Sequence, residues 1–458
     1  MISPVGLMLG EPLELEYVAT AVEKFNHCVT VVDLILEKRP IEFFVRVHRP
    51  HIVYFSGHLA HSDVVTALAA RVKAVDAAII TVVGGVPEEV RPKDFRDASL
   101  DHVGGEASLE LLVALANDGA PPPASHRSRT CYPAYPSRRK TTRYRQRYHY
   151  LFHDRCATLK TVFRAASDCD FCSCQHVTDG HLSYRDLDDV MEEIDRIEEK
   201  NVVIVDDDFL ADQARVELFC HLVRDRRVDK NFVVAGRADF IARHPETMAL
   251  LKSVGVSAVC VGIEAGRQSD LAVPGKNITV DLNRRALAVL EANDILAYCR
   301  LLVRPDRGRQ DVDRLIRQMR RFSCPVVGVE PLTAPPGTPL FDTFRSDLPA
   351  GPQPSEVWDL GHVLIRPTAL SEREFDRQIR RSLLRLNLRL RVHAAALRRF
   401  GVRPWFRVVR GVLSLACQYR EHDRGPHAVR CGRDATARRW ANFITTATED
   451  QRSSSRLG

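Results

Sequence analysis

The chain has 458 residues, which is enough for two or three domains, and its 45% apolar and 27% charged residues are ordinary for a globular protein. No run of 18 apolar residues occurs, so the sequence predicts no membrane-spanning helix, and the N-terminus lacks the basic segment of a signal peptide. Twelve cysteines without regular spacing therefore indicate reduced thiols and a cytoplasmic location.

Residues 4–105 alternate short apolar runs with amphipathic stretches, which predicts a parallel, Rossmann-like sheet with helices on both faces. We assign this domain to residues 1–118. The expected strands are Val5–Leu9, Val29–Val32, Ile52–Ser56, Ala78–Val83 and a short strand near His102, and the expected helices include Leu13–Phe25 and Asp63–Val75.

Small and polar residues follow most of these predicted strands, at the carboxyl ends where parallel sheets bind ligands. They are Gly10, Ser56, Gly57, Gly84, Gly85, Gly105 and Glu106. Glycines there let a bulky ligand approach the backbone, although each pair alone is more typical of a tight turn. Together they indicate a binding site.

Residues 119–148 are predicted to be a linker, because they include Pro121-Pro122-Pro123 and many serines. Their basic residues and tyrosines resemble a nucleic-acid-binding segment, but a solvated linker accounts for them, so we expect no nucleic-acid partner.

From residue 149 to residue 350 the βα rhythm returns on a larger scale and predicts a partial (β/α)6 barrel with its chemistry at the carboxyl ends of the strands. The expected strands are Leu159–Phe163, Val202–Val205, Phe232–Ala235, Ala258–Ile263, Ile295–Val303 and Val326–Val329.

Residues 351–424 are predicted to be helical, and the basic character of the chain, whose net charge is +7, belongs to this segment. Within residues 371–424 there are 14 arginines, no lysine and five acidic residues. Arg373, Arg377, Arg381, Arg385 and Arg389 recur at every fourth position, as on one face of a helix. We favour packing on the barrel with the arginines in solvent, and contact of residues 371–410 with an anionic membrane surface is the alternative. The tail, residues 425–458, is predicted to be disordered.

Three cysteines lie close together after the first predicted barrel strand: Cys169, Cys172 and Cys174. Clustered thiolates without secretory features usually bind iron or zinc, and His176 would complete four zinc ligands. Unligated thiols are the remaining interpretation.

The spacing Cys169-Asp-Phe-Cys172 resembles the end of the radical S-adenosylmethionine (SAM) signature, Cys-x3-Cys-x-aromatic-Cys, but Ala165 stands where that signature has its first cysteine. The resemblance implies a [4Fe-4S] cluster with Cys169 and Cys172 as ligands and Phe171 near the adenine of SAM. Cys174 is the candidate third ligand, and Cys156 would reach the cluster only through an unusual loop.

Strand ends further along the barrel strengthen the resemblance, because Asp206-Asp207-Asp208-Phe209 matches a family segment near the methionyl amine of SAM. The resemblance therefore implies that Asp206 and Asp207 contact SAM. Arg237 and Glu264 end the next two strands and would contact its carboxylate or ribose. Any one of these residues alone is more typical of an ordinary surface turn.

The whole order, to about residue 385, resembles the cobalamin-binding radical SAM proteins, with residues 147–153 and 203–210 as further matching segments. That family places cobalamin in the N-terminal domain and the cluster in the barrel, although the first strand here lacks an Asp-x-His-x-x-Gly motif. The resemblance implies an electron donor such as flavodoxin or ferredoxin and a small-molecule or lipid-like substrate.

Three functional hypotheses follow. The first is cobalamin-dependent methyl transfer to an unactivated carbon in lipid or secondary-metabolite biosynthesis. The second is a catalytically inactive cobalamin-binding relative without an intact cluster, which Ala165 suggests. The third is radical chemistry without methyl transfer.

Overall fold

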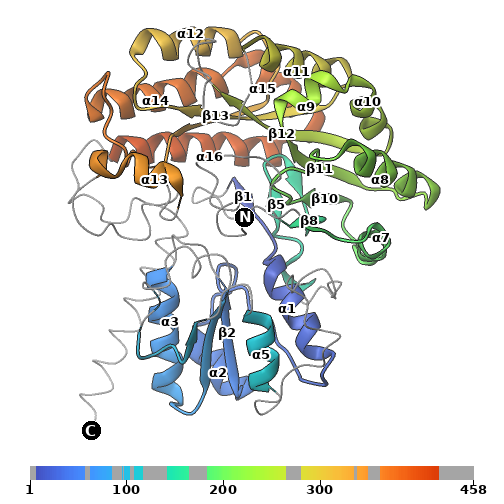
Figure 1. Cartoon of the computed structure of the whole chain (residues 1–458), viewed down its shortest axis with the longest axis vertical. Coiled ribbons are helices and arrows are strands. Elements are labelled where there is room, and N and C mark those ends of the chain that lie inside the picture. The colour runs from blue at the N-terminus through green and yellow to red at the C-terminus, as the bar shows by residue number, and fades with distance from the viewer. Residues whose placement is uncertain are drawn as a thin grey trace.

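The computed structural model describes residues 7–56, 62–84, 95, 97–103, 108–116, 142–163, 183–264, 280–334, 338–348 and 362–421. Figure 1 shows a larger lobe built around a six-stranded sheet and a smaller lobe built around a three-stranded sheet. No helix in these ranges is long and apolar enough to cross a membrane.

The smaller lobe has the predicted parallel sheet with helices on both faces. Its strands run in the order β2 (Ile52–Ser56), β3 (Ile80–Gly84) and β4 (His102–Val103). Its helices are α1 (Leu13–Glu23), α2 (Ile41–His48), α3 (Ser62–Val75) and α5 (Ser108–Ala116). Val53 and Phe55 pack with α2 and α3, whereas Ile52 and Tyr54 pack with α1 and α5. This alternation is what a two-residue repeat on a sheet covered on both sides requires.

Two predicted strands of this lobe differ in the structure. The segment Val29–Val32 forms no strand, and the Val31 carbonyl accepts a hydrogen bond from the Arg143 side chain (3.4 Å). The first strand, β1 (Met8–Leu9), pairs antiparallel with β5 (His149–Tyr150), which in turn pairs with β6 (His153–Asp154). Leu7 and Met8 pack into the core of the larger lobe, so burial there replaces pairing with β2.

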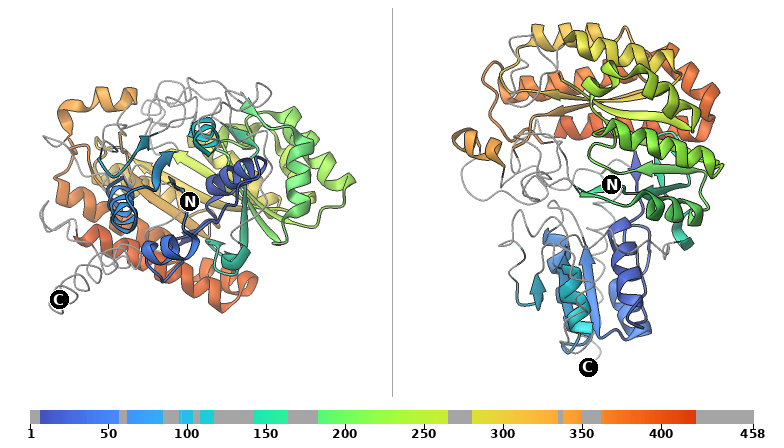
Figure 2. Two further views of the ribbon diagram at one scale, coloured as in Figure 1. Left: turned by 90° about the horizontal axis from the view of Figure 1, so that it is seen from below. Right: turned by 45° about the vertical axis from the view of Figure 1, so that its right-hand side comes forward.

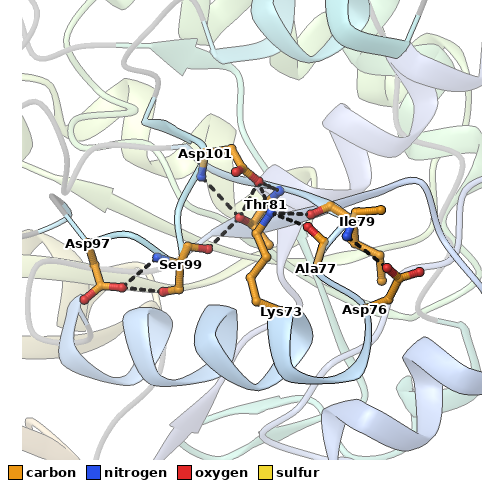
Figure 3. Close-up of polar contacts among 9 residues, drawn as sticks. Lys73, Asp76, Ala77, Ile79, Thr81, Asp97, Ser99 and Asp101 are labelled. Atoms are coloured by element: carbon orange, nitrogen blue, oxygen red, sulfur yellow. Dashed lines mark hydrogen bonds and ion pairs between the residues drawn. The ribbon is translucent and has the colours of Figure 1, made fainter.

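A polar network fixes the approach to β4 (Figure 3). The Asp101 carboxylate accepts hydrogen bonds from the Thr81 backbone N–H (2.7 Å) and from Lys73 Nζ (2.5 Å). Desolvation raises the pKa of Asp101, but these bonds outweigh it and hold the pKa below its ordinary value. Thr81 also donates to the Ser99 carbonyl (2.6 Å). The network lies at the amino end of β3, away from the carboxyl edge.

The six-stranded sheet of the larger lobe is parallel throughout and follows chain order, as a partial barrel requires. Its strands are β7 (Cys156–Leu159), β10 (Asn201–Ile204), β11 (Asn231–Gly236), β12 (Val256–Glu264), β13 (Leu296–Val303) and β14 (Val326–Pro331). The first strand of this sheet, β7, begins and ends earlier than the predicted strand Leu159–Phe163. The short strand β8 (Val162–Phe163) pairs antiparallel with β9 (Ser183–Tyr184) instead.

Helices cover the outer side of this sheet (Figures 1 and 2). They are α7 (Leu187–Arg196), α8 (Gln213–Asp225), α9 (Ala238–Arg243), α10 (Pro245–Ser253), α11 (Val280–Ala292) and α12 (Arg309–Met319). Asp186 and Asp212 cap α7 and α8 by accepting backbone N–H bonds, which satisfies donors that a helix start leaves unpaired.

The C-terminal region is helical, as predicted, with α13 (Pro339–Thr343), α14 (Glu372–Asn387), α15 (Leu390–Phe400) and α16 (Val402–Glu421). Two 3-10 turns, η4 (Thr142–Tyr144) and η5 (Arg345–Asp347), complete the described elements. The α14 helix packs against β14, where the Asn387 amide accepts from the Val327 N–H (2.9 Å) and donates to the Val327 carbonyl (2.7 Å). The Asn387 side chain therefore pairs with the backbone N–H and carbonyl groups of Val327 at the free edge of the sheet.

The predicted arginine repeat divides into two groups, and its last member, Arg389, lies beyond the end of α14. Arg373, Arg377 and Arg381 are exposed, as expected for a solvated face. Arg385 instead forms an ion pair with Asp313 (2.6 Å), and Arg389 donates to the Cys324 carbonyl (2.6 Å).

Candidate functional site

The carboxyl edge of the small sheet lies on the side of the larger lobe. Ser56 and Gly84, the last residues of β2 and β3, are register partners. The Ser56 hydroxyl donates to Glu14 in the first turn of α1. Just before that helix, the Glu11 carboxylate accepts from the Thr158 backbone N–H of β7 (3.1 Å). This chain of contacts joins the carboxyl edge of the small sheet to the first strand of the larger sheet.

A buried ion pair fastens α1 to the larger lobe. The Arg185 guanidinium, fully buried, donates to Glu193 (2.6 Å) and to the Tyr17 hydroxyl of α1 (2.9 Å). Its Nε and Nη2 atoms have no hydrogen-bond partner among the described residues. Removing Glu193 would leave a buried charge without compensation, a change that typically costs about 3–5 kcal/mol.

Asp206, at the end of β10, holds the chain that leaves β7. Its carboxylate accepts from the Thr161 N–H (2.6 Å), the Thr161 hydroxyl (2.6 Å) and the Val162 N–H (3.0 Å). Burial raises its pKa, because desolvation outweighs these bonds. With its acceptor capacity used locally, Asp206 positions the start of the loop that carries the three clustered cysteines.

The next two aspartates have different surroundings. Asp207 is partly exposed and lies 3.8 Å from the Lys160 ammonium. Asp208 is 8% exposed, and its Oδ1 atom has no hydrogen-bond partner in the described part of the chain. Desolvation raises the pKa of Asp208 to about 6, although the Arg237 charge acts in the opposite direction. A buried carboxylate oxygen without a donor fits a cationic ligand group.

Arg237 and Glu264 follow the next two strands, as predicted. Arg237 directly follows β11 and donates to the Asp239 carboxylate from Nε (2.9 Å) and Nη2 (3.4 Å). Glu264 is the last residue of β12 and pairs in register with Leu302. The structure thus brings Arg237 near Asp208 and places Glu264 at the same edge of the sheet.

The concave face of the sheet carries a charged pair that the sequence analysis missed. Arg300 donates bidentately to Glu330 (3.2 and 2.7 Å), with 58% of the arginine side chain exposed. Its register partner Gly262 has open space where a side chain would begin. The signal in the sequence that could have indicated this pair is that Arg300 and Glu330 are charged residues within otherwise apolar strands.

Below this pair, at the amino-terminal half of the strands, the concave face is closed by the β5–β6 hairpin. The Tyr150 hydroxyl lies 3.0 Å from the Cys260 sulfur, and His153 Nε2 lies 3.0 Å from the Tyr298 hydroxyl. Burial lowers the pKa of His153 to about 4 and raises that of Cys260 to about 11. The floor of the barrel is therefore uncharged at neutral pH.

The predicted cluster residues Cys169, Phe171, Cys172 and Cys174 lie outside the described residues, as do Ala165 and His176. Cys156 begins β7 at the amino edge of the sheet, and its sulfur donates to the His153 carbonyl (3.2 Å). Burial raises its pKa to about 12, which disfavours a thiolate ligand. The part of the chain that the structure describes holds no other group of metal-binding side chains.

Of the residues predicted at the other edge, Ser56 and Gly84 are brought together, as described above. Gly10 follows β1 and therefore belongs with the antiparallel β1–β5–β6 sheet. Gly57, Gly85, Gly105 and Glu106 lie outside the described residues.

Comparisons with known proteins point to one group of enzymes, although no family model matches the chain. The hopanoid C-3 methylase of Methylococcus capsulatus is 28% identical over 391 residues, which cover 80% of this chain and 74% of that protein. The structure of TsrM, a radical SAM methyltransferase from Kitasatospora setae with cobalamin and a [4Fe-4S] cluster bound, has a TM-score of 0.64. The two chains are 15% identical, and the match covers 90% of this chain and 97% of the TsrM chain.

OxsB, a cobalamin-dependent radical SAM enzyme solved with aqua-cobalamin and SAM bound, has a TM-score of 0.61 at 12% identity. The match covers 98% of this chain and 78% of the OxsB chain. At such identities the solved structures establish the fold. The predicted α/β fold class, with its parallel six-stranded sheet, and the resemblance drawn from the sequence are confirmed.

Proposed function

We propose, from the premise that this chain belongs to the cobalamin-binding radical SAM proteins, that it is an enzyme that methylates an unactivated carbon. The observation that carries the proposal is the Asp208 carboxylate at the end of the second barrel strand, with its buried oxygen unpartnered among the described residues. Such an oxygen fits the methionyl ammonium of SAM. Asp208 therefore takes the role that the sequence analysis gave to Asp206 and Asp207.

The other residues keep the roles that the resemblance implies. Cys169, Cys172 and Cys174 would hold the cluster, Arg237 and Glu264 would contact SAM, and Ser56 and Gly84 would border cobalamin in a domain of residues 1–118. When bound, these groups would supply a reducing electron, a SAM-derived radical and a methyl group. Asp206 holds the chain that leads into the cluster loop, and the contacts of Glu11 and Arg185 keep the two lobes together.

A lipid-like substrate is supported by the relative that methylates hopanoids. The open space at Gly262 and its register partner Arg300 support a substrate position on this face of the sheet, where the guanidinium N–H groups that do not face Glu330 would offer a polar contact. We place the protein in the cytoplasm, with a flavodoxin or ferredoxin as electron donor.

The second candidate function is that of a cobalamin-binding relative without chemistry of its own. Ala165, in place of the first signature cysteine, favours it. The two candidates differ in cluster content, because only the enzyme requires three thiolates on iron.

SAM binding by the anaerobically reconstituted full chain tests the proposal. We expect isothermal titration to show that Asp208→Asn weakens SAM binding by roughly tenfold to a hundredfold, because a charge-assisted hydrogen bond in a buried site is lost. The exposed Asp225→Asn on α8 should bind like the wild type. Absence of SAM binding by the wild type would contradict the proposed function. Unchanged binding by Asp208→Asn would contradict only the role of that residue.

A further inference from the structure

The last two helices expose an unusual number of apolar side chains. Nine large apolar residues are exposed in the described ranges, and six of them lie between residues 388 and 413. They are Leu388, just before α15, and Leu390, Leu397, Val402, Phe406 and Leu413 on the two helices. Leu390 is 89% exposed and Phe406 is 59% exposed. Surface clusters of this kind mark interaction sites, whereas single exposed residues need no explanation.

The same helices carry arginines that have no acidic partner among the described residues. Arg391 and Arg398 on α15, and Arg403 and Arg410 on α16, are all exposed and form no ion pair there. Residues 377–420 contain 12 arginines and no aspartate or glutamate. We call the exposed apolar residues of α15 and α16 and these four arginines the terminal-helix surface.

The opposite faces of these helices are firmly packed, so the exposure is not a sign of a loose segment. Val408, Val412 and Ala416 are buried in the main core. Gly411 packs so closely on Leu7 that a Cβ atom would lie 2.4 Å from its side chain. Arg407 pairs with Asp154, and the Trp405 indole donates to His393 of α15 (3.0 Å). The two helices therefore present their outer residues on a fixed base.

We propose that the terminal-helix surface docks the protein on an anionic lipid bilayer surface. An interfacial helix needs apolar side chains that enter the acyl boundary and basic side chains that meet the headgroups, and both are present here. A nucleic acid or an acidic protein surface would satisfy the arginines but would leave Leu390 and Phe406 without an apolar environment. The inference is independent of the proposed chemistry, because docking requires no bound cofactor.

This assignment places membrane contact further along the chain than the repeat on α14 suggested. Arg385 and Arg389 are engaged by Asp313 and by backbone carbonyls, and no large apolar residue of α14 is exposed. Arg377 and Arg381 of α14 are exposed and so provide matched charge controls.

Sedimentation of the full chain with vesicles tests the proposal. We expect binding to vesicles of equal phosphatidylglycerol and phosphatidylcholine and much weaker binding to phosphatidylcholine alone. Phe406→Gln with Leu413→Gln should weaken binding to the anionic vesicles by about tenfold or more, since each loses apolar area in the interface. The control pair Val47→Gln with Leu218→Gln, exposed by 58% and 52% elsewhere, should bind like the wild type.

Charge reversal separates a defined surface from general attraction. Arg403→Glu with Arg410→Glu should abolish binding to anionic vesicles, whereas Arg377→Glu with Arg381→Glu, which changes the net charge equally, should retain most of it. Equal losses in the two pairs would overturn the proposal, as would absence of wild-type binding to anionic vesicles. Self-association of the wild type in sedimentation velocity, lost in the Phe406 and Leu413 variant, would assign the surface to a second copy instead.

Discussion

Three consecutive aspartates show how strongly position decides the chemistry of a residue. Asp206 is buried and hydrogen-bonded, Asp207 faces Lys160, and Asp208 is buried with an unpartnered oxygen among the described residues. Because its pKa is raised to about 6, the fold favours the protonated form of Asp208. Stability from this group is therefore present at low pH and is lost as the pH rises from about 4 to about 6.

We expect Asp208→Asn to stabilise the ligand-free protein at pH 7.5, by about 1–3 kcal/mol, and to have little effect at pH 4. Thermal denaturation of both proteins across this range measures the difference. Asp239→Asn is a control variant whose effect on stability should have the opposite pH dependence. Desolvation raises the pKa of Asp239, but hydrogen bonds from Arg237 hold it below its usual value, so its contribution is lost as the pH falls. A difference independent of pH would contradict the raised pKa.

The sequence could predict that a carboxylate follows the second barrel strand, but not which of the three stays available. The three aspartates are adjacent in the sequence, and only the fold brings the backbone N–H groups of Thr161 and Val162 within hydrogen-bond distance of Asp206. The Arg300–Glu330 pair was missed for a similar reason, since a charged residue in one strand predicts no partner on the neighbouring strand, thirty residues away.

At the scale of elements, continuous apolar runs were reliable because a strand covered on both faces needs them. All six barrel strands were predicted for this reason, although β7 was placed three residues late. The run Val29–Val32 has the same composition but no neighbouring strand to pair with in the described sheet. The α2 helix was not anticipated, because its eight residues are too few for a clear period.

Gly255 lies at the junction between α10 and β12, where the backbone leaves no room for a side chain. Its φ of +97° is unfavourable for other residues, and a Cβ atom would lie 2.2 Å from the Lys230 carbonyl oxygen. We expect Gly255→Ala to lower the free energy of unfolding by about 2–4 kcal/mol. Gly401→Ala, with φ of +79° and nothing within 4 Å of the added carbon, should cost about 1 kcal/mol. Equal shifts in thermal midpoint would show that the carbonyl contact has no effect.

At the scale of the molecule, the two lobes are joined through contacts of Glu11 and the buried Arg185, next to the Ser56–Glu14 hydrogen bond at the carboxyl edge of the small sheet. The alternation of strands and helices predicted both sheets. It did not predict that the first strand would leave the small sheet for β5, because a two-residue antiparallel pairing has no sequence period. Such an arrangement suits transfer between a group bound at one edge and a group bound at the other.

The central claim, a radical SAM enzyme despite Ala165, is tested most directly by iron and acid-labile sulfide per chain after anaerobic reconstitution. The account predicts about four of each, held by Cys169, Cys172 and a third thiolate. Loss of the cluster in Cys174→Ser, but not in Cys28→Ser, would identify that third ligand. Iron and sulfide near zero in the wild type would contradict the claim and leave a cobalamin-binding relative without a cluster.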